Sequence, residues 1–236
     1  MASTVASPSR PSARPVRRPR TSRSDGADTR QRILDIAGQV FAEKGHGRAT
    51  SKEICAAAGV NLAAVNYHFG GKDGLYQAVL VEAHGHLVSL DDLRAIAGDG
   101  TAPEKQFDRL LRRLLEPKSP RARPAWALRV LVQEMMAPSP HVPVLIRKAV
   151  LPKVKVLFSL VSRVLGVAPD HPGVQRAVAF AVVPCFVLLV APQPMRRHVL
   201  PAIDTDPAHT VDELVAYSLA GLRALGRRHR ASTSPA

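Results

Sequence analysis

The sequence predicts an all-α protein, with a small N-terminal three-helix unit followed by a larger C-terminal helical unit. Hydrophobic residues make up 46% of the chain but aromatic residues only 4%, so the core must consist mainly of Leu, Val and Ala. Ala and Leu favour helices, and apolar residues recur at helical spacing along the chain. No stretch shows the strict alternation of a half-buried strand. The length of 236 residues suits one compact domain and a smaller one.

Residues 1–27 are rich in Ser, Pro, Ala and Arg. Such a composition cannot bury enough apolar surface to order itself, so we expect a disordered basic tail. It either touches DNA non-specifically as an arm or has no structural role. It lacks the apolar region of a secretion signal.

The first helix is expected to begin with Asp28 as its cap and to end at Gly45 and Gly47. Its apolar side chains, among them Ile33, Ala37 and Phe41, form one stripe at helical spacing. This stripe is expected to pack across the two helices that follow.

The segment TSKEICAAAGVNLAAVNYHFGGK, residues 50–72, predicts two short helices joined by a tight turn. Thr50 and Glu53 have the spacing of a capping box, Gly59 supplies the left-handed turn, and Asn61 caps the second helix. Ile54 and Val65 fall where the helices pack on each other. This pattern is a helix-turn-helix, whose second helix is the kind that enters a DNA major groove.

The following residues NYHFGGKDGLY, from Asn66 to Tyr76, resemble the DNA-binding domain of the TetR family of bacterial transcription regulators. Phe69 and Lys72 match its Phe-x-x-Lys signature, and GVNLAAVNYHFGGKDGLY is similar to the CecR-like subgroup. The resemblance covers residues 29–83. It implies a DNA-binding domain at 28–75 and a helical effector-binding and dimerisation domain at 76–228. The polar composition of residues 229–236 predicts a short disordered tail.

The C-terminal unit reads as helices separated by Pro and Gly. A helix is expected from Lys72 past Leu87, and another around the stripe Phe107 to Leu115, closed by Pro117. Further helices are expected at Ala125–Met136, Val142–Leu165 with a kink at Pro152, Gln175–Val190 and Val211–Leu225.

These patterns and the resemblance nominate three sets of site residues. The DNA contacts are Thr50, Ser51, Asn61, Leu62, Ala63, Ala64, Asn66, Tyr67, His68 and Lys72. The effector contacts are Trp126, Met135 and Phe158, on helices expected in the C-terminal core, with plain core packing as the alternative. The dimer interface is formed by Phe180, Val183, Val187, Leu188, Leu214, Tyr217, Leu222 and Leu225.

Chemical motifs of enzymes are missing from the sequence. It contains no nucleophile elbow, phosphate-binding loop, dinucleotide fingerprint or zinc-protease pattern, and its nine histidines are scattered. We therefore expect no catalytic residue, metal or cofactor.

The two cysteines form no ligand cluster, which favours a reduced, cytoplasmic protein. The apolar run from Ala177 to Ala191 contains Pro184 and is too short to span a bilayer ~30 Å thick.

The formal net charge of +14 suits a polyanionic partner, although a general preference for Arg explains part of it. Taken together, the sequence predicts a homodimeric transcription regulator, most simply a repressor, that leaves a palindromic operator when a small effector binds. One alternative is an enzyme or carrier with an apolar helical pocket, whose helix-turn-helix serves only for packing. Another is an architectural DNA-binding protein without an effector.

Overall fold

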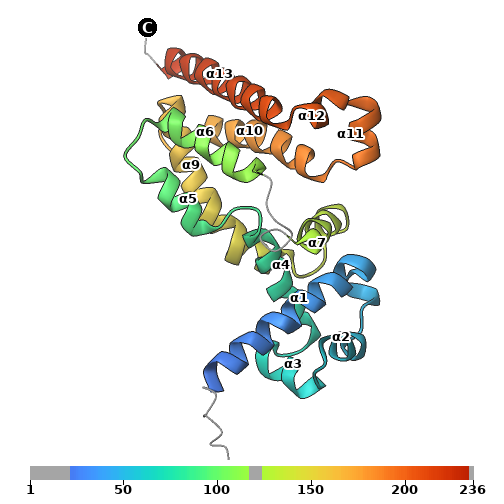
Figure 1. Cartoon of the computed structure of the whole chain (residues 1–236). Coiled ribbons are helices and arrows are strands. Elements are labelled where there is room, and N and C mark those ends of the chain that lie inside the picture. The colour runs from blue at the N-terminus through green and yellow to red at the C-terminus, as the bar shows by residue number, and fades with distance from the viewer. Residues whose placement is uncertain (1–21, 117–123, 234–236) are drawn as a thin grey trace, which may run out of the picture.

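The computed structural model describes residues 22–116 and 124–233, and every regular element among them is helical (Figure 1). This confirms the predicted all-α fold. The elements are α1 (Ser22–Arg48), α2 (Ser51–Ala58), α3 (Leu62–Phe69), α4 (Lys72–Gly85), α5 (Leu90–Ala97), α6 (Pro103–Leu115), α7 (Ala125–Met136), α8 (Val142–Leu145), the π-helical turn η1 (Ile146–Val150), α9 (Leu151–Leu165), α10 (Pro172–Val190), α11 (Gln193–Val199), α12 (Pro201–Thr205) and α13 (Pro207–Thr233).

Both ends of the described chain are more helical than the sequence predicts. Helix α1 begins at Ser22 rather than after Asp28, so the predicted disordered tail is wrong for residues 22–27, while residues 1–21 lie outside the described part. Helix α13 continues to Thr233, across most of the predicted second tail. Arg230 donates to the carbonyl of Leu165, and the ring of His229 lies beside that of His171. Polarity alone suggested fraying, whereas these tertiary contacts hold the helix end.

Helix α4 is shorter than expected, because it ends at Gly85 instead of running past Leu87. A new helix, α5, then starts after Ser89, whose hydroxyl accepts a hydrogen bond from the Asp92 N–H at 2.9 Å. This N-cap is a local signal that the sequence reading missed. The short helices α11 and α12 were not predicted either.

The region around Pro152, where a kink was predicted, contains a π-helical turn instead of a regular α-helix. Pro152 lies in the first turn of α9, and the π-helical turn η1 immediately precedes that helix. Proline has no N–H for the carbonyl four residues earlier, and a wider turn relieves the clash between its ring and that carbonyl.

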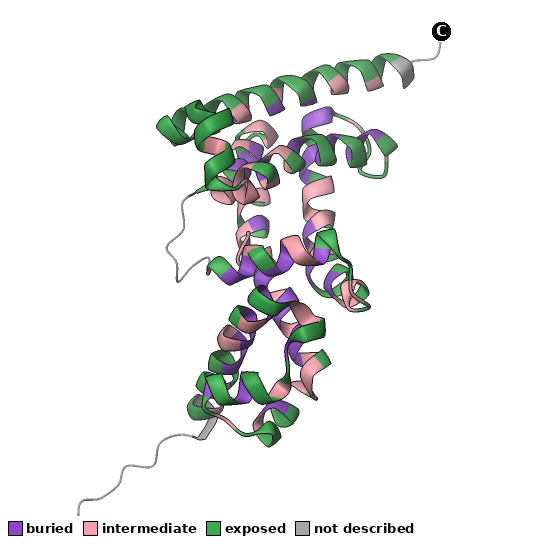
Figure 2. Ribbon diagram, turned by 90° about the vertical axis from the view of Figure 1, so that its right-hand side faces the viewer, coloured by how far each residue is buried: buried purple, intermediate pink, exposed green. Residues whose placement is uncertain are grey.

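The helices enclose two hydrophobic cores. The first joins α1–α4 with α7, α8 and η1, and the second joins α5, α6, α9, α10 and α13. Figure 2 shows buried residues on the inward sides of the helices, whereas α13 is exposed along much of its length. The expected domain boundary at residues 75/76 therefore falls inside α4. The expectation that α7 lies in the C-terminal core is wrong, because periodicity identifies a buried face but not the partner that covers it.

Trp126 brings α7 close to α1. The Trp126 side chain is buried over Gly38, where a Cβ atom would lie only 2.5 Å from the indole ring. The ring of His86 meets the indole edge-on, with the ring centres 5.7 Å apart. Gly38 is therefore required for this close approach rather than for its backbone freedom.

Buried polar groups reinforce the same junction. The Tyr76 hydroxyl of α4 donates to Glu134 Oε2 of α7 at 2.6 Å. The other carboxylate oxygen of Glu134 accepts from the N–H and hydroxyl of Ser139, at 2.8 and 2.6 Å. Burial, followed by the contact with Glu134, raises the pKa of Tyr76. Glu134 is only 4% exposed, so this full set of donors is what makes its burial tolerable.

The end of α4 is fixed to α9 by a second polar contact. Lys153 Nζ donates to the His84 carbonyl at 2.7 Å and lies 2.9 Å from His84 Nδ1. Burial, followed by the charge of Lys153, lowers the pKa of His84 to about 4. His84 is therefore neutral at pH 7 and can accept the lysine's hydrogen bond through Nδ1.

Gly38→Ala should destabilise the protein by about 1–3 kcal/mol, because the added methyl group forces Trp126 off α1. Gly26→Ala in the same helix is the control, since a Cβ atom there meets no neighbour within 4 Å. That change should be neutral or stabilising. Urea denaturation measures both, and equal stability of the two variants would contradict the Trp126–Gly38 packing.

Stability should also fall as the pH drops from about 6.5 towards 4. Between these pH values His84 takes up a proton in the unfolded chain but stays neutral in the folded protein. A falling pH therefore favours the unfolded state. The loss attributable to His84 is on the order of 2 kcal/mol at pH 5 relative to pH 7.5. Denaturation at both pH values should show a smaller loss in His84→Gln and an unchanged loss in His209→Gln, which alters an exposed histidine. The same pH dependence in His84→Gln and wild type would refute this assignment.

Candidate nucleic-acid interface

Three caps define the geometry of α2 and α3. Thr50 Oγ1 accepts from the Glu53 N–H at 3.2 Å, and Glu53 Oε2 accepts from the Thr50 N–H at 3.1 Å, which completes the predicted capping box. Gly59 ends α2 with φ 63° and ψ 38°, a left-handed conformation suited to glycine. Asn61 Oδ1 accepts from the Ala64 N–H at 2.9 Å and starts α3. The predicted helix-turn-helix is thus present with its expected signals.

An ion pair fixes α2 against α1. Lys44 Nζ lies 2.7 Å from Glu53 Oε1, so Glu53 serves both the cap and the preceding helix. The hydrogen bond from Lys44, followed by those from Thr50, lowers the pKa of Glu53. Because both charges are solvent-exposed, this pair positions the helices more than it stabilises them.

Helix α3 presents one face to solvent and buries the other. Val65 is fully buried, whereas Leu62 is 52% exposed and Tyr67 is 86% exposed. Ala63 and Asn66 are also exposed, and at helical spacing these four residues share one side of the helix. Large apolar side chains left open on a capped, well-packed helix indicate a contact surface.

The other predicted DNA contacts lie around this face. Thr50 and Asn61 are exposed at the starts of α2 and α3, and Ser51 is half-buried in the first turn of α2. Lys72 is half-buried as the first residue of α4, directly after Gly70 and Gly71.

Two of the predicted DNA contacts lie off this face. Ala64 packs against the first core, so its expected orientation towards the groove of DNA is wrong. His68 lines a separate groove of about 330 Å³ together with Arg30 and Lys148. The sequence placed both residues on the recognition helix but did not show which side each occupies.

Three cations near the helix-turn-helix were missed. The Arg30 guanidinium lies 5.1 Å from the centre of the Phe69 ring and connects α1 to the end of α3. Arg48 and Lys52 are exposed on either side of Thr50. The positive net charge predicted a polyanionic partner such as DNA. No local sequence motif, however, distinguished these three residues from other cations on the surface.

The predicted effector contacts do not form one site. Trp126 belongs to the first core, Phe158 packs on the second, and Met135 is 57% exposed. A large groove lies elsewhere, between α5–α6 and the start of α13. It has a volume of about 870 Å³ and is lined by Ile96, Leu115, Val211, Arg109, Arg112 and Arg113, among others.

Carboxylates neutralise the arginines of this groove. Arg112 pairs with Asp108 and Asp212, at 3.0 and 2.6 Å, and Arg113 pairs with Asp92 and Glu116, each at 3.0 Å. The groove therefore combines apolar walls with arginines whose charge is already compensated.

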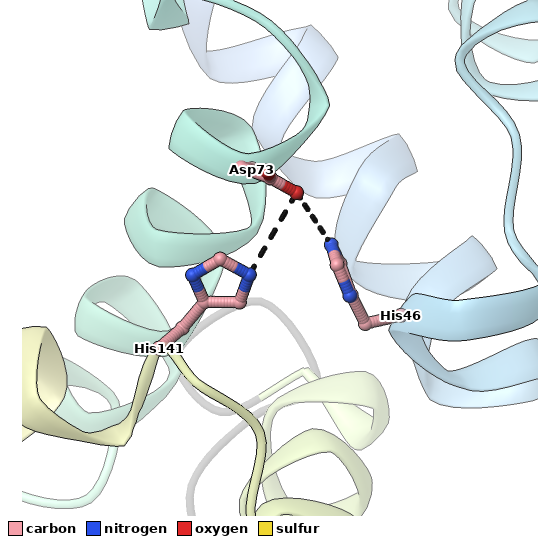
Figure 3. Close-up of side chains that lie close together, drawn as sticks. All are labelled: His46, Asp73 and His141. Carbon is pink, nitrogen blue, oxygen red and sulfur yellow. Dashed lines mark hydrogen bonds and ion pairs between the residues drawn. The ribbon is translucent and has the colours of Figure 1, made fainter.

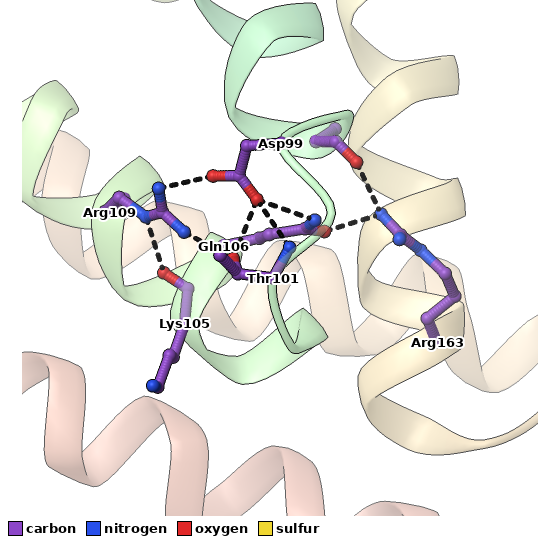
Figure 4. Close-up of polar contacts among 7 residues, drawn as sticks. Asp99, Thr101, Lys105, Gln106, Arg109 and Arg163 are labelled. Atoms are coloured by element: carbon purple, nitrogen blue, oxygen red, sulfur yellow. Dashed lines mark hydrogen bonds and ion pairs between the residues drawn. The ribbon is translucent and has the colours of Figure 1, made fainter.

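Arg109 belongs to a polar network around Asp99 (Figure 4). Asp99 pairs with Arg109 and accepts from Thr101 and from Gln106 Nε2, the latter at 3.1 Å. Gln106 is buried and accepts from Arg163 of α9 at 2.8 Å. This network fixes the loop between α5 and α6 onto α9.

The predicted dimer residues surround two adjoining apolar grooves between α10 and α13, of about 740 and 510 Å³. Phe180, Val183, Val187 and Tyr217 are 51–75% exposed, and Leu188, Leu214 and Leu225 are half-buried. Leu222 is only 3% exposed and belongs to the second core, so its assignment to an open surface is wrong. Pro184 lies within α10 and lines both grooves.

Helix α10 is also longer than its apolar run. It has 19 residues, and an 18-residue stretch within it has a mean hydropathy of 2.0 and is only 33% buried. By length and composition alone the whole helix is sufficient to cross a membrane, whereas the apolar run from Ala177 to Ala191 is shorter and contains Pro184.

A capped helix-turn-helix with an exposed second helix, joined to a helical domain, defines a DNA-binding regulator. Residues 33–79 match the family described as bacterial regulatory proteins, tetR family. Residues 103–222 match the C-terminal domain of the HTH-type transcriptional dual regulator CecR. The chain belongs to the TetR family of transcription regulators and is CecR-like, as its sequence motifs predicted.

Curated relatives agree with this assignment. The chain is 42% identical over 72 residues to the HTH-type transcriptional regulator SrpR of Pseudomonas putida, covering 30% of this chain and 33% of SrpR. It is 38% identical over 64 residues to the HTH-type transcriptional repressor BepR of Brucella suis biovar 1, covering 27% of this chain and 31% of BepR. The first relatives are matched over about a third to a half of their length. The names of these relatives describe transcription regulators and not enzymes. This confirms the prediction that the chain is a regulator rather than an enzyme.

Solved structures show the same fold over most of the chain. The fatty acid degradation regulator FadR from Bacillus halodurans superposes with a TM-score of 0.61 at 19% identity, covering 83% of this chain and 96% of FadR. A TetR-family regulator from Mesorhizobium loti gives a TM-score of 0.56 at 15% identity, covering 85% and 96%. At these identities the likeness concerns the fold alone.

Proposed function

We propose that this protein is a cytoplasmic, homodimeric repressor that binds a palindromic operator and is released by a small-molecule effector. The observation that carries the proposal is the exposed face of α3, which presents Leu62, Ala63, Asn66 and Tyr67 on a capped helix-turn-helix. A helix of this kind fits the major groove of B-DNA.

The side chains on this face of α3 are uncharged, and they suit direct contacts to the edges of DNA bases. Leu62 and Ala63 offer apolar contacts to a thymine methyl group, and Asn66 offers the donor and acceptor pair that matches adenine. Lys72, at the N-terminus of α4, supplies a cation next to free backbone N–H groups, a combination that favours a phosphate. In this arrangement α3 specifies sequence and the flanking caps and Lys72 position the protein.

A second copy of the chain is the proposed cover for the α10–α13 surface. Phe180 and Tyr217 are 63% and 75% exposed on neighbouring helices, and the adjoining grooves are mostly apolar. Two copies joined here would form a four-helix interface, as the family resemblance implies. Dimerisation also accounts for the apolar, poorly buried α10 without placing it in a membrane.

The groove between α5–α6 and α13 is the proposed effector site, in place of the three residues first nominated. Its volume of about 870 Å³ lies within the usual range for small-molecule sites. Occupancy would shift α6 relative to α9 and α13, and α9 in turn contacts the end of α4 through Lys153. Release follows if the effector favours a dimer geometry that no longer fits two operator half-sites.

Lys72→Ala should weaken binding to all DNA sequences about equally and reduce the log–log salt slope by ~1, because one phosphate contact is lost. Fluorescence anisotropy on the duplex upstream of the protein's own gene and on a scrambled duplex measures both quantities. Lys155→Ala, an exposed cation of α9, is the matched control and should leave them unchanged. Wild-type affinity and slope in folded Lys72→Ala would contradict the contact.

The same duplex separates the competing functions. Asn66→Ala should reduce affinity for the specific duplex more than for the scrambled one, since a base contact discriminates by ~1–3 kcal/mol. If neither duplex binds, the helix-turn-helix serves only for packing. If both bind alike and Asn66→Ala has no effect, the protein is an architectural binder. A promoter–reporter fusion, with and without the protein, then distinguishes repression from activation.

Phe180→Asp combined with Tyr217→Asp should convert the dimer to a monomer, because charges placed in an apolar interface must be desolvated. Both side chains are exposed within one chain, so the fold should survive. Sedimentation velocity measures the mass, and Arg223→Asp, at an exposed position on another side of α13, is the control. A wild-type protein that stays monomeric at all concentrations would overturn the proposed dimer.

A further inference from the structure

Two histidines and one aspartate from three separate segments meet beside the helix-turn-helix (Figure 3). His46 lies near the end of α1, Asp73 in the first turn of α4, and His141 just before α8. His46 Nε2 is 2.9 Å and His141 Nε2 is 3.7 Å from Asp73 Oδ1. One ligand atom from each residue lies within 4.8 Å of the other two.

Aromatic rings hold the two imidazoles in place. The centre of the Tyr76 ring lies 4.6 Å from that of His46 and 5.6 Å from that of His141. Phe41 packs edge-on against Tyr76 at 4.8 Å. The histidine side chains are only 22% and 12% exposed, whereas Asp73 is 71% exposed. The result is a half-buried pair of imidazoles with one side open to water through the carboxylate.

The charges around the cluster make Asp73 important. Lys72 directly precedes Asp73 in the sequence, and its positive charge acts against a bound cation. The negative charge of Asp73 is therefore essential to the site.

We propose that His46, Asp73 and His141 bind a divalent transition metal ion of the Zn²⁺ class, with water completing the coordination on the open side. Tetrahedral zinc with N and O ligands at ~2.0–2.2 Å places pairs of ligand atoms about 3.4 Å apart. The observed 2.9 and 3.7 Å lie on either side of this value, and the two histidine ligand atoms lie within 4.8 Å of each other. Side-chain rotations would therefore bring all three ligand atoms onto one ion. Two histidines and a carboxylate suit zinc and related ions.

The simpler alternative is a hydrogen-bonded bridge in which Asp73 accepts from both imidazoles and favours the N-terminus of α4. Gln77 bears on this choice, because its side-chain amide lies 3.3 Å from His141 Nδ1. A metal on Nε2 requires a proton on Nδ1, which Gln77 can accept through its oxygen after an amide flip. The same residue can thus orient His141 in either state.

A bound ion would connect parts of the protein that are distant in sequence. It would link the end of α1 and the start of α4 to the segment between α7 and α8. These are the same helices that Trp126 and Glu134 already hold together. Zn²⁺ should therefore raise the thermal unfolding midpoint, since it binds only the folded arrangement.

Isothermal titration of ZnCl₂ into untagged, chelator-dialysed, full-length protein tests the site. We expect one ion per chain and a raised midpoint, with binding lost in Asp73→Asn, His46→Gln and His141→Gln. Gln77→Leu should weaken binding by about 10- to 100-fold without abolishing it. The matched control is His209→Gln, which alters an exposed histidine–carboxylate pair on α13 and should bind as wild type.

Co²⁺ provides a second readout, because its visible spectrum should show nitrogen and oxygen ligation without a thiolate band. Circular dichroism identifies any histidine variant that fails to fold. Asp73→Asn decides the matter in that case, since its exposed side chain can change without disturbing the core. Absence of Zn²⁺ binding in wild type, or undiminished binding in folded Asp73→Asn, would overturn the proposal and leave the hydrogen-bonded bridge.

Discussion

The packing of α7 on α1 and α4 is the constraint on which the rest of the structure depends. Trp126 requires the absence of a side chain at Gly38, and Glu134 requires the Tyr76 hydroxyl and the donors of Ser139. The helix-turn-helix therefore rests on a core that is completed only by residues far along the chain. Because interiors pack densely, α7 cannot shift without disturbing α1 and α4. The DNA-binding unit and α7 should move as one body.

This arrangement limits how the second core can influence DNA binding. A polar contact between the two cores runs from Lys153 of α9 to His84 of α4, next to the π-helical turn before α9. A π-helical turn offers two ways of continuing a helix and often marks a functional site. Under the proposed function, an effector near α6 and α13 would act through α9 on this junction. The single helix expected from Lys72 past Leu87 is replaced by two helices, α4 and α5, which are joined by residues 86–89.

The sequence predicted features that depend on neighbouring residues. The capping box of Thr50, the turn at Gly59 and the cap at Asn61 all follow from local hydrogen bonding, and each occurs as expected. Sequence-based prediction failed where a residue's position depends on contacts with residues far away in the chain. Trp126 has the periodicity of a core residue but packs against the other core, and Leu222 is apolar yet serves the chain's own interior. Ala64 shows the same limit on a smaller scale, because a short helix does not reveal how far its buried face extends.

The histidine cluster illustrates this limit and also relates the two proposed sites. His46, Asp73 and His141 are widely separated in sequence, and only the docking of the α7–α8 segment on α1 and α4 brings them together. Asp73 directly follows Lys72, the proposed phosphate contact. The carboxylate of Asp73 is a negative charge beside Lys72, and it opposes the attraction between Lys72 and a DNA phosphate. A divalent ion would reverse that charge to positive. If both proposals hold, the metal should therefore strengthen the contribution of Lys72 to DNA binding rather than compete with it, through charge as well as through a more rigid α4.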